Sequence, residues 1–474
     1  MDIKKLYQLY QQHPQITTDS RDCPEGSIFL ALKGASFNGN QFALQALEKG
    51  CSYAIVDEDI TQHPTPITPR NATLSEREHP TPNTPRNATL SEREHLIKVD
   101  DCLQTFKDLA REHRRQFEMP VIGITGTNGK TTTKELIRAV LSECYNVMAT
   151  EGNFNNDVGV PKTLFRLNEK TDIAVVEMGA SHPGDIKTLV ETAEPTCGLI
   201  TNVGRAHLLG FGSFEGVCQT KGELYDYLVS HDCPIFVNRD NEHLMKMVHD
   251  SWLKVHGKRP DLYYYGQSDN EDILIRGEVV SCAPFLKFRW REQDHAAGYQ
   301  SEWMEVQTHL IGAYNLDNML AAIIVGYVND VPFEQINHAL ENYVPTNNRS
   351  QMTETEHNHL IVDAYNANPT SMAAAIDNFR LVEADRKMAI LGMMGELGAV
   401  SVEEHQKLVD LLREAHFDQV WLVGDEFRKT QCPFPIFNNV EEVKEALQHE
   451  QPQQYYILIK GSNSNRLFEL PALL

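Results

Sequence analysis

Long apolar runs are missing from this sequence of 474 residues. No stretch approaches the about 18 uninterrupted apolar residues that suggest a membrane span, and the start, MDIKKLYQLYQQ, does not resemble a signal peptide. Cations are scarce too, since 43 lysines and arginines stand against 66 aspartates and glutamates and give a formal net charge of −23. This balance argues against a nucleic-acid partner. We therefore expect a soluble chain without membrane insertion.

Paired cysteines are also missing. The nine cysteines are scattered along the chain without a C-x-x-C pair. This pattern indicates reduced thiols in a cytoplasm rather than a disulfide framework or a zinc site. The length suffices for about three domains of ordinary size.

The segment VIGITGTNGKTTT at residues 121–133 constrains the chemistry most tightly. An apolar strand runs into a Gly-rich turn and a helix start, where unpaired N–H groups and the helix dipole favour a polyphosphate. Lys130 can reach the terminal phosphates of a nucleoside triphosphate, and Thr131 can hold Mg²⁺. The spacing departs from the usual G-x-x-x-x-G-K-[ST] pattern, because Ile124 takes the place of the first glycine. A Gly-rich connection that binds nothing is the plainer alternative.

Alternating strand and helix patterns predict an α/β protein of three domains. Residues 1–104 predict a small α/β domain, and residues 105–344 predict a central, P-loop-type, mostly parallel sheet with helices on both faces. Residues 345–474 predict a Rossmann-like domain that lacks the G-x-G-x-x-G fingerprint. We expect this last domain to complete a site rather than to hold a cofactor of its own.

A tandem repeat interrupts the first domain at 63–94. Residues 63–78, HPTPITPRNATLSERE, recur at 79–94 with the single change of Ile67 to Asn83. The repeat is rich in Pro, Thr, Arg and Glu and has too little apolar surface to fold. We expect a mobile surface insertion.

Two polar residues stand at the ends of predicted central strands. Glu177 follows IAVV, and His207 follows GLITNVGRA. Open α/β sheets bind ligands beyond the carboxyl ends of their strands, so both side chains can point toward a triphosphate at Lys130 and Thr131. Taken alone, a Glu or His at a strand end is more often a helix cap or a satisfied polar residue.

Five motifs together resemble the Mur ligase family. They are TGTNGKTTT at 125–133, EGNFNNDVGVPKTL at 151–164, VEMGASHPGDI at 176–186, ITNVGRAHLLGFGS at 200–213 and KGEL at 221–224. This family consists of ATP-dependent amide-bond-forming ligases of cytoplasmic peptidoglycan precursor synthesis. The resemblance covers essentially the whole chain apart from the repeat. It implies a ligase that binds ATP and Mg²⁺ and serves cell-wall growth and division.

Further motifs resemble one member of the family, which joins D-alanyl-D-alanine to UDP-N-acetylmuramoyl-tripeptide. They are TTDSR at 17–21, ALKGASFNGNQF at 31–42, GAYNLDNMLAA at 312–322, DAYNANPTSM at 363–372, LGMMGELG at 391–398 and ILIKGSNSNRL at 457–467. The implied reaction moves the γ-phosphoryl group of ATP onto a carboxylate and makes an acyl phosphate. An amine then displaces phosphate, and ADP and phosphate are released.

The resemblance also implies roles for single residues. The implied catalytic residues are Lys130, Glu177, His207, Lys221 and Arg349. The implied metal ligands are Thr131, Glu177, His207 and, if carbamylated, Lys221. The implied ATP-binding residues are Gly126, Thr127, Asn128, Gly129, Lys130, Thr131, Thr132, Asn315, Asn318, Arg349 and Asp363. For Asn315 and Asn318 a plain N-terminal helix cap is the alternative.

The implied substrate contacts come from both ends of the chain. They are Ser20, Arg21, Lys33, Gly34, Asn38, Asn153, Asn155, Asn156, Asn366, Asn368 and Lys460. The first five would bind the uridine diphosphate end, and the last three would line the face where the amine lands. Ordinary turns rich in Gly, Asn and Ser are the alternative for most of them.

Two other functions stay open at this point. A sister ligase that adds a single amino acid, or a folylpolyglutamate synthase, would share the central motifs. A P-loop NTPase outside the ligases would explain the phosphate loop but not the other motifs. We expect the chain to act as a monomer.

Overall fold

The computed structural model describes residues 2–34, 36–60, 93–255, 260–282, 284–345 and 351–474. The chain divides into two compact units. The first comprises Met1–Glu118, Gly152–Glu169 and Glu191–Glu194, and the second comprises Met119–Glu151, Lys170–Val190 and Pro195–Leu474. Arg349 and all but the last two residues of the 63–94 repeat lie outside the described residues.

A four-stranded parallel sheet, in the order β1-β2-β3-β4, organises the described residues of the first unit. Its strands are β1 (Ile16–Thr17), β2 (Ile28–Leu30), β3 (Tyr53–Val56) and β4 (Leu96–Lys98). Its helices are α1 (Ile3–Gln12), η1 (Gly39–Phe42), α2 (Ala43–Glu48), α5 (Cys102–Arg114) and α7 (Gly159–Leu164). Apolar side chains of the sheet, such as Phe29 and Ile55, share one core with Leu6 of α1 and Phe106 of α5.

A mixed, mostly parallel sheet of ten described strands organises the central part of the second unit. The strands are β5 (Val121–Thr125), β6 (Val147–Ala149), β7 (Ile173–Glu177), β8 (Cys197–Ile200), β9 (Ile235–Asn238), β10 (Leu262–Gly266), β11 (Ile275–Cys282), β12 (Phe285–Asp294), β13 (Tyr299–Gln300) and β14 (Met304–Ile311). Strand β5 lies between β7 and β8 and is buried at every residue. Its continuous apolar run is typical of a parallel strand that is covered on both faces.

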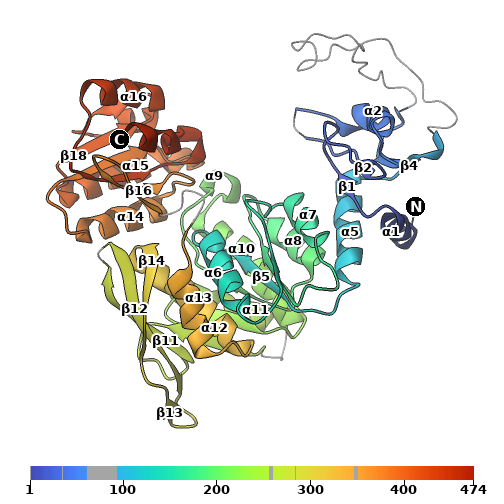
Figure 1. Ribbon diagram of the computed structural model, residues 1–474, viewed down its shortest axis with the longest axis horizontal. Coiled ribbons are helices and arrows are strands. Elements are labelled where there is room, and N and C mark those ends of the chain that lie inside the picture. Colours follow the sequence, from blue (N-terminus) through green and yellow to red (C-terminus); the bar gives the residue numbers. More distant parts are fainter. Residues whose placement is uncertain (1, 35, 61–92, 256–259, 283, 346–350) are drawn as a thin grey trace. The chain divides into compact units, whose positions relative to one another are not determined.

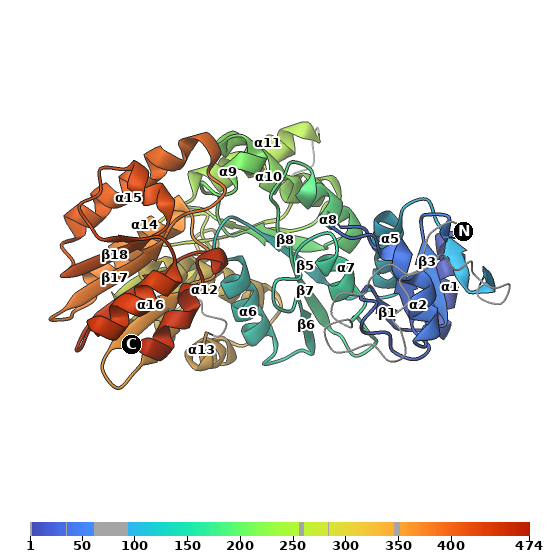
Figure 2. The ribbon, with the colours of Figure 1, turned by 90° about the horizontal axis from the view of Figure 1, so that it is seen from above.

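Helices cover both faces of this sheet (Figure 1). They are α6 (Lys130–Leu141), α8 (Asp185–Ala193), α9 (Leu208–Phe211), α10 (Phe214–Ser230), α11 (Glu242–Lys254), η3 (Ala313–Asn315), α12 (Leu316–Val328) and α13 (Phe333–Asn342). Figure 2 shows α6 and α12 on one side of β5, β7 and β8, and α10 and α11 on the other. Helix α12 is apolar nearly all round, since it packs against both α6 and the sheet.

A second sheet, in the order β15-β16-β20-β17-β18-β19, organises the described C-terminal residues. Its strands are β15 (Gln351–Glu354), β16 (His359–Asp363), β17 (Lys387–Gly392), β18 (Gln419–Val423), β19 (Ile436–Phe437) and β20 (Tyr456–Lys460). Its longer helices are α14 (Pro369–Leu381), α15 (Ser401–Ala415) and α16 (Val440–His449). All pairs are parallel except β15 with β16. The predicted fold class, three α/β sheets with helices, is confirmed.

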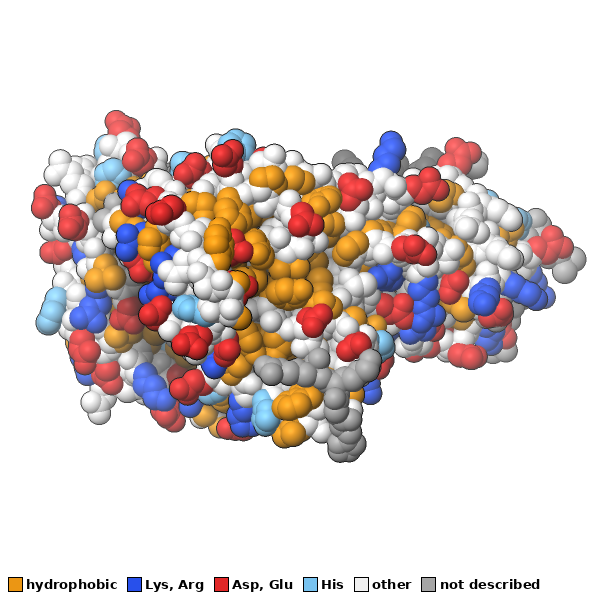
Figure 3. All heavy atoms as spheres, turned by 90° about the horizontal axis from the view of Figure 1, so that it is seen from below, with side chains coloured by type: hydrophobic (Ala, Val, Ile, Leu, Met, Phe, Trp, Pro, Cys, Tyr) orange, Lys and Arg blue, Asp and Glu red, His pale blue; other side chains and the backbone are white. Residues whose placement is uncertain are grey.

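The predicted domain limits stay a prediction. Residue 104 falls inside α5, and the limit at 344 directly precedes residues that are not described. None of the described helices combines the length and apolar character needed to cross a membrane. All nine cysteines lie among the described residues, where each is a free thiol. Acidic and basic side chains are interspersed over the face drawn in Figure 3.

Candidate active site

The phosphate loop joins the end of β5 to the start of α6. Gly126 has a φ of +150° and Gly129 a φ of +78°, values that L side chains rarely adopt. A Cβ at Gly129 would lie 2.6 Å from Oδ1 of Asn318. The loop is also fixed by β8, because Thr201 Oγ1 donates to the carbonyl of Asn128 at 2.6 Å and Asn202 Oδ1 accepts from its N–H at 3.0 Å. The loop is therefore a rigid turn that ends at a helix N-terminus.

Lys130, the first residue of α6, lies over this turn. Its Nζ donates to the carbonyls of Gly126 at 2.7 Å and Thr127 at 3.1 Å. The ammonium is thus held at the N-terminus of α6, where the helix dipole also favours negative charge. This is the arrangement expected of a triphosphate cradle. Thr132 follows in the same first turn of α6.

Thr131 and Glu177 meet beside the loop. Thr131 Oγ1 donates to Glu177 Oε2 at 2.9 Å, and both side chains are buried. Register explains the meeting: Ile124 of β5 pairs with Glu177 of β7, so Glu177 stands at the same carboxyl edge from which the loop leaves. Hydroxyl and carboxylate oxygens are the donors that Mg²⁺ prefers. Thr131 and Glu177 would thus supply two oxygen ligands to a Mg²⁺ ion.

His207 lies at the start of α9, in a left-handed conformation with a φ of +51°. Its Nδ1 is hydrogen-bonded to the Glu396 carboxylate, which belongs to the C-terminal part of the unit. Burial lowers the pKa of His207, while the Glu396 charge opposes this effect and the charges of Lys130 and Lys221 add to it. His207 therefore lies within electrostatic reach of Lys130 and Lys221, and the predicted catalytic roles of the three stay a prediction.

Lys221 is buried within α10, with 2% of its surface exposed. Burial, assisted by the charge of Lys130, holds the pKa of its amine well below the ordinary range of lysine, and Asp185 opposes this. Its Nζ lies 5.7 Å from the centroid of the Phe211 ring. A buried lysine of this kind is costly as a cation. Burial thus disfavours the charged form of this amine.

Asn315 and Asn318 form a chain of amides behind the loop. Thr133 Oγ1 donates to Asn318 Oδ1 at 3.0 Å, Asn318 Nδ2 donates to Asn315 Oδ1 at 2.8 Å, and Asn315 Nδ2 donates to the Ile311 carbonyl at 2.8 Å. Asn315 occupies the N-cap position of α12 without a side-chain capping bond. These contacts anchor the phosphate loop to α12, and the predicted adenine and ribose contacts stay a prediction.

The C-terminal residues gather at the carboxyl ends of β16 and β20. Lys460 is buried, and its Nζ lies 2.5 Å from Asp363 Oδ2 and 3.3 Å from the Asn366 carbonyl. Asn368 caps α14 in a capping box. This local structural role was the alternative to a substrate contact. It also contacts the phosphate loop, since its Nδ2 donates to Asn128 Oδ1 at 2.8 Å. The DAYNANPTSM segment and the phosphate loop therefore meet.

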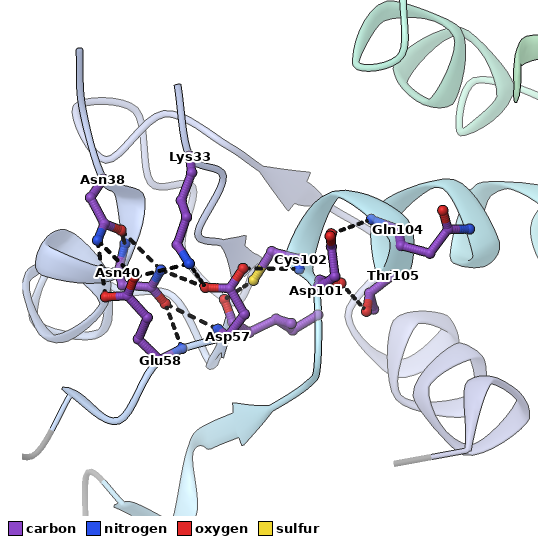
Figure 4. Close-up of polar contacts among 10 residues, drawn as sticks. Lys33, Asn38, Asn40, Asp57, Glu58, Asp101, Cys102, Gln104 and Thr105 are labelled. Atoms are coloured by element: carbon purple, nitrogen blue, oxygen red, sulfur yellow. Dashed lines mark hydrogen bonds and ion pairs between the residues drawn. The ribbon is translucent and has the colours of Figure 1, made fainter. Parts of the chain in front are cut away.

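The predicted nucleotide-end residues lie within the first unit. Arg21 pairs with Asp19 at 2.8 Å and is largely exposed, and the Ser20 carbonyl accepts from Lys49. Lys33 and Asn38 reach instead toward acidic residues that follow β3 (Figure 4). Gly34 donates its N–H to the Phe37 carbonyl at 2.9 Å and closes the turn between them.

The three clustered asparagines also belong to the first unit. Asn156 Oδ1 accepts from the N–H of Gly159 at 2.8 Å, next to the start of α7, and the Asn155 N–H donates to the Asn153 carbonyl at 2.8 Å. These are the turn contacts that Asn and Gly favour. Their predicted role toward the sugar and peptide stays a prediction.

Three site residues escaped the sequence reasoning. Thr201 and Asn202 hold the loop backbone, and Glu396 holds His207. All three stand in the quoted motifs ITNVGRAHLLGFGS and LGMMGELG. Thr201 and Asn202 directly follow β8, so strand-end position alone would have marked them, whereas Glu396 lies four residues beyond the end of β17.

Comparisons with known proteins match three successive segments of the chain to domains of one family. Residues 14–114 match the Mur ligase family catalytic domain, 124–326 the Mur ligase middle domain, and 348–463 the Mur ligase glutamate ligase domain. A UDP-N-acetylmuramoyl-tripeptide–D-alanyl-D-alanine ligase from Synechocystis is 31% identical over 87% of this chain and 79% of its own length. The chain belongs to the Mur ligase family.

Other Mur ligases extend the likeness over the full length. The enzyme of the same name from Bacillus subtilis is 29% identical over 96% of this chain and 92% of its own. A crystal structure of MurF from Acinetobacter baumannii superposes with a TM-score of 0.80 at 27% identity, covering 99% of this chain and 97% of that one. A UDP-N-acetylmuramoyl-L-alanyl-D-glutamate–2,6-diaminopimelate ligase, at 16% identity and a TM-score of 0.54, shares the fold.

Proposed function

We propose that this Mur ligase joins D-alanyl-D-alanine to UDP-N-acetylmuramoyl-tripeptide and converts ATP to ADP and phosphate. The observation that carries the proposal is the contact of Asn368 with Asn128 of the phosphate loop. A plain NTPase has no need of a second domain at its phosphate loop, whereas a ligase must bring an amine to the phosphorylated carboxylate. Relatives from Synechocystis and Bacillus subtilis that carry this name support the choice of substrates.

The phosphate loop would bind and orient the triphosphate. A carboxylate is a poor electrophile, so the γ-phosphoryl group must first move onto it, and this step needs charge neutralisation above all. Positive charge would come from the N-terminus of α6 and from Lys130, whose Nζ would first leave the Gly126 and Thr127 carbonyls. Thr201 and Asn202 hold the loop backbone itself in place, so little reorganisation of that backbone accompanies the transfer.

Thr131 and Glu177 would hold Mg²⁺ beside the loop, and His207 is a further candidate ligand. A bound Mg²⁺ ion neutralises charge on the phosphate oxygens. Lys221 would act as a carbamate: its neutral amine attacks CO₂, an N–C bond forms and a proton leaves. This change gives the buried side chain a negative charge and oxygen donors. The pKa of Lys221, held low by burial, favours the amine form that this step requires.

The remaining residues would contact the successive parts of the two substrates. Ser20, Arg21 and the loop at 33–39 would bind the nucleotide end, and the asparagines at 153, 155 and 156 the sugar and peptide. Asp363, Asn366, Asn368 and Lys460 would line the landing face of the amine, with Arg349 on the phosphates. Closure of the C-terminal domain would exclude water from the acyl phosphate.

Cellular setting and assembly are part of the same proposal. The free thiols support a reducing cytoplasm, and we propose a monomer as the working form. Sedimentation at micromolar concentration tests the second point.

Phosphate release tests the reaction. The purified protein is incubated with ATP, Mg²⁺ and UDP-N-acetylmuramoyl-tripeptide, with D-alanyl-D-alanine, with single amino acids or without an amine. Release that depends on the dipeptide supports the proposal. Release with a single amino acid would indicate a sister ligase, and release without any amine would indicate an NTPase.

A further inference from the structure

A closed polar network lies at the carboxyl edge of the first unit's sheet (Figure 4). Lys33 comes soon after β2, and Asp57 and Glu58 directly follow β3, its parallel neighbour. Lys33 Nζ lies 2.9 Å from Asp57 Oδ1 and 2.9 Å from Glu58 Oε1. The Lys33 ammonium therefore contacts both carboxylates.

Asn40 is the centre of this network. It is buried, with 1% of its surface exposed. Its Oδ1 accepts from the N–H groups of Asp57 at 3.0 Å and Glu58 at 3.4 Å. Its Nδ2 donates to Asp57 Oδ1 at 2.7 Å and to Asn38 Oδ1 at 2.9 Å. All donors and acceptors of the amide are thus used, which fixes its orientation.

The network fixes both sides of the loop at 33–39, of which residue 35 is not described. Lys33 stands at its entrance, and Asn38 at its exit donates to both Glu58 oxygens, at 3.1 and 2.9 Å. Asp57 reaches further, because its Oδ2 accepts from the N–H of Cys102 at the start of α5. One carboxylate thereby ties the loop to the helix that follows β4.

The charge balance decides the role of Lys33. The Asp57 and Glu58 carboxylates neutralise its ammonium, and their hydrogen bonds raise its pKa. A diphosphate would have to compete with both carboxylates for this cation, and it would meet their negative charge as well.

We propose that Lys33 is a positioning residue: its ammonium braces Asn38 and Asn40 through Asp57 and Glu58, and it does not itself contact the nucleotide end of the substrate. Asp57 and Asn40 belong to the same brace. This inference rests on the proposed function and refines it.

Binding of UDP-N-acetylmuramoyl-tripeptide to the full chain tests the brace. Lys33→Met, Asp57→Asn and the double variant are compared by calorimetry, with kcat and KM measured alongside. Lys5→Met on α1, which removes an exposed cation of the same unit, is the matched control. We expect each single variant to weaken binding and raise KM about tenfold with kcat nearly unchanged, and the double variant to be no weaker than either, because both changes break one brace.

If Lys33 instead contacts the diphosphate directly, Asp57→Asn should strengthen substrate binding rather than weaken it. Removing that carboxylate would free the lysine and tighten binding, and this result would overturn the inference. Additive losses, or a Lys33→Met variant equal to Lys5→Met, would overturn it too. Thermal unfolding checks that each variant is folded. If Asp57→Asn is not folded, Glu58→Gln takes its place, and we expect it to weaken binding in the same way. A wild-type chain that does not bind the nucleotide would refute the proposed function instead.

Discussion

Replacing Gly129 by alanine should damage the phosphate loop more than its backbone conformation alone explains. Gly129 has a φ of +78°, and a left-handed conformation costs an alanine about 1–2 kcal/mol. The new Cβ would also lie 2.6 Å from Asn318 Oδ1. That amide is held by Thr133 and Asn315, and losing these two buried hydrogen bonds costs about 1 kcal/mol each. We expect a total of about 3–4 kcal/mol.

Gly184 provides a matched control. It has a φ of +86°, it directly precedes helix α8, and a Cβ there would meet nothing within 4 Å. Gly184→Ala should therefore cost only the backbone term of about 1–2 kcal/mol. The difference between the two variants isolates the clash with Asn318.

Urea unfolding followed by tryptophan fluorescence, to which Trp290 in the core of the central sheet contributes, measures the two losses. ATP titration by calorimetry should show that Gly129→Ala loses affinity and that Gly184→Ala keeps it. Equal losses of stability in the two variants would refute the reasoning, because the loop would then not be packed against Asn318 as described.

Three further predictions concern the charged residues of the site. Lys221→Met should flatten the rise of the unfolding free energy with pH. Because burial depresses the pKa of Lys221, the unfolded chain binds a proton that the folded chain lacks, up to the ordinary range of lysine. Urea unfolding at pH values from about 7 to 10 measures this slope, and an unchanged slope would contradict the prediction. Glu396→Gln should lower the pKa of His207 further, because Glu396 opposes the effect of burial; NMR titration of labelled histidine checks this, and a raised pKa would count against it. Thr131→Val should remove Mg²⁺-dependent turnover and, by taking a hydrogen bond from buried Glu177, destabilise the fold by about 1–3 kcal/mol, whereas Thr131→Ser should behave like wild type in both assays.

The sequence was sufficient to predict those parts of the site that neighbouring strands bring together. The meeting of Thr131 with Glu177 follows from a loop and a strand end on one edge of a parallel sheet, and both were predicted there. Likewise, the apolar runs at β5 and β7 predicted the buried strands on which this geometry depends. In such cases pattern and fold carry the same information.

Other contacts could not be read from local pattern. Asn128 and Asn368 are separated by 240 residues, and only the packing of the C-terminal part on the loop joins them. The ion pairs of Lys33 could not be predicted either, because its motif gives no sign of the two carboxylates that follow β3. Side-chain pairing between helices and strands depends on register and packing, which cannot be read from a single sequence.

Isotope transfer tests the central claim most directly. UDP-N-acetylmuramoyl-tripeptide labelled with ¹⁸O in its terminal carboxylates is incubated with ATP, Mg²⁺ and D-alanyl-D-alanine, and the released phosphate and the nucleotide product are analysed by mass spectrometry. An acyl-phosphate ligase predicts ¹⁸O in the phosphate and a product lengthened by the dipeptide. Unlabelled phosphate together with unchanged UDP-N-acetylmuramoyl-tripeptide would contradict the account, because ATP would then have been hydrolysed by water.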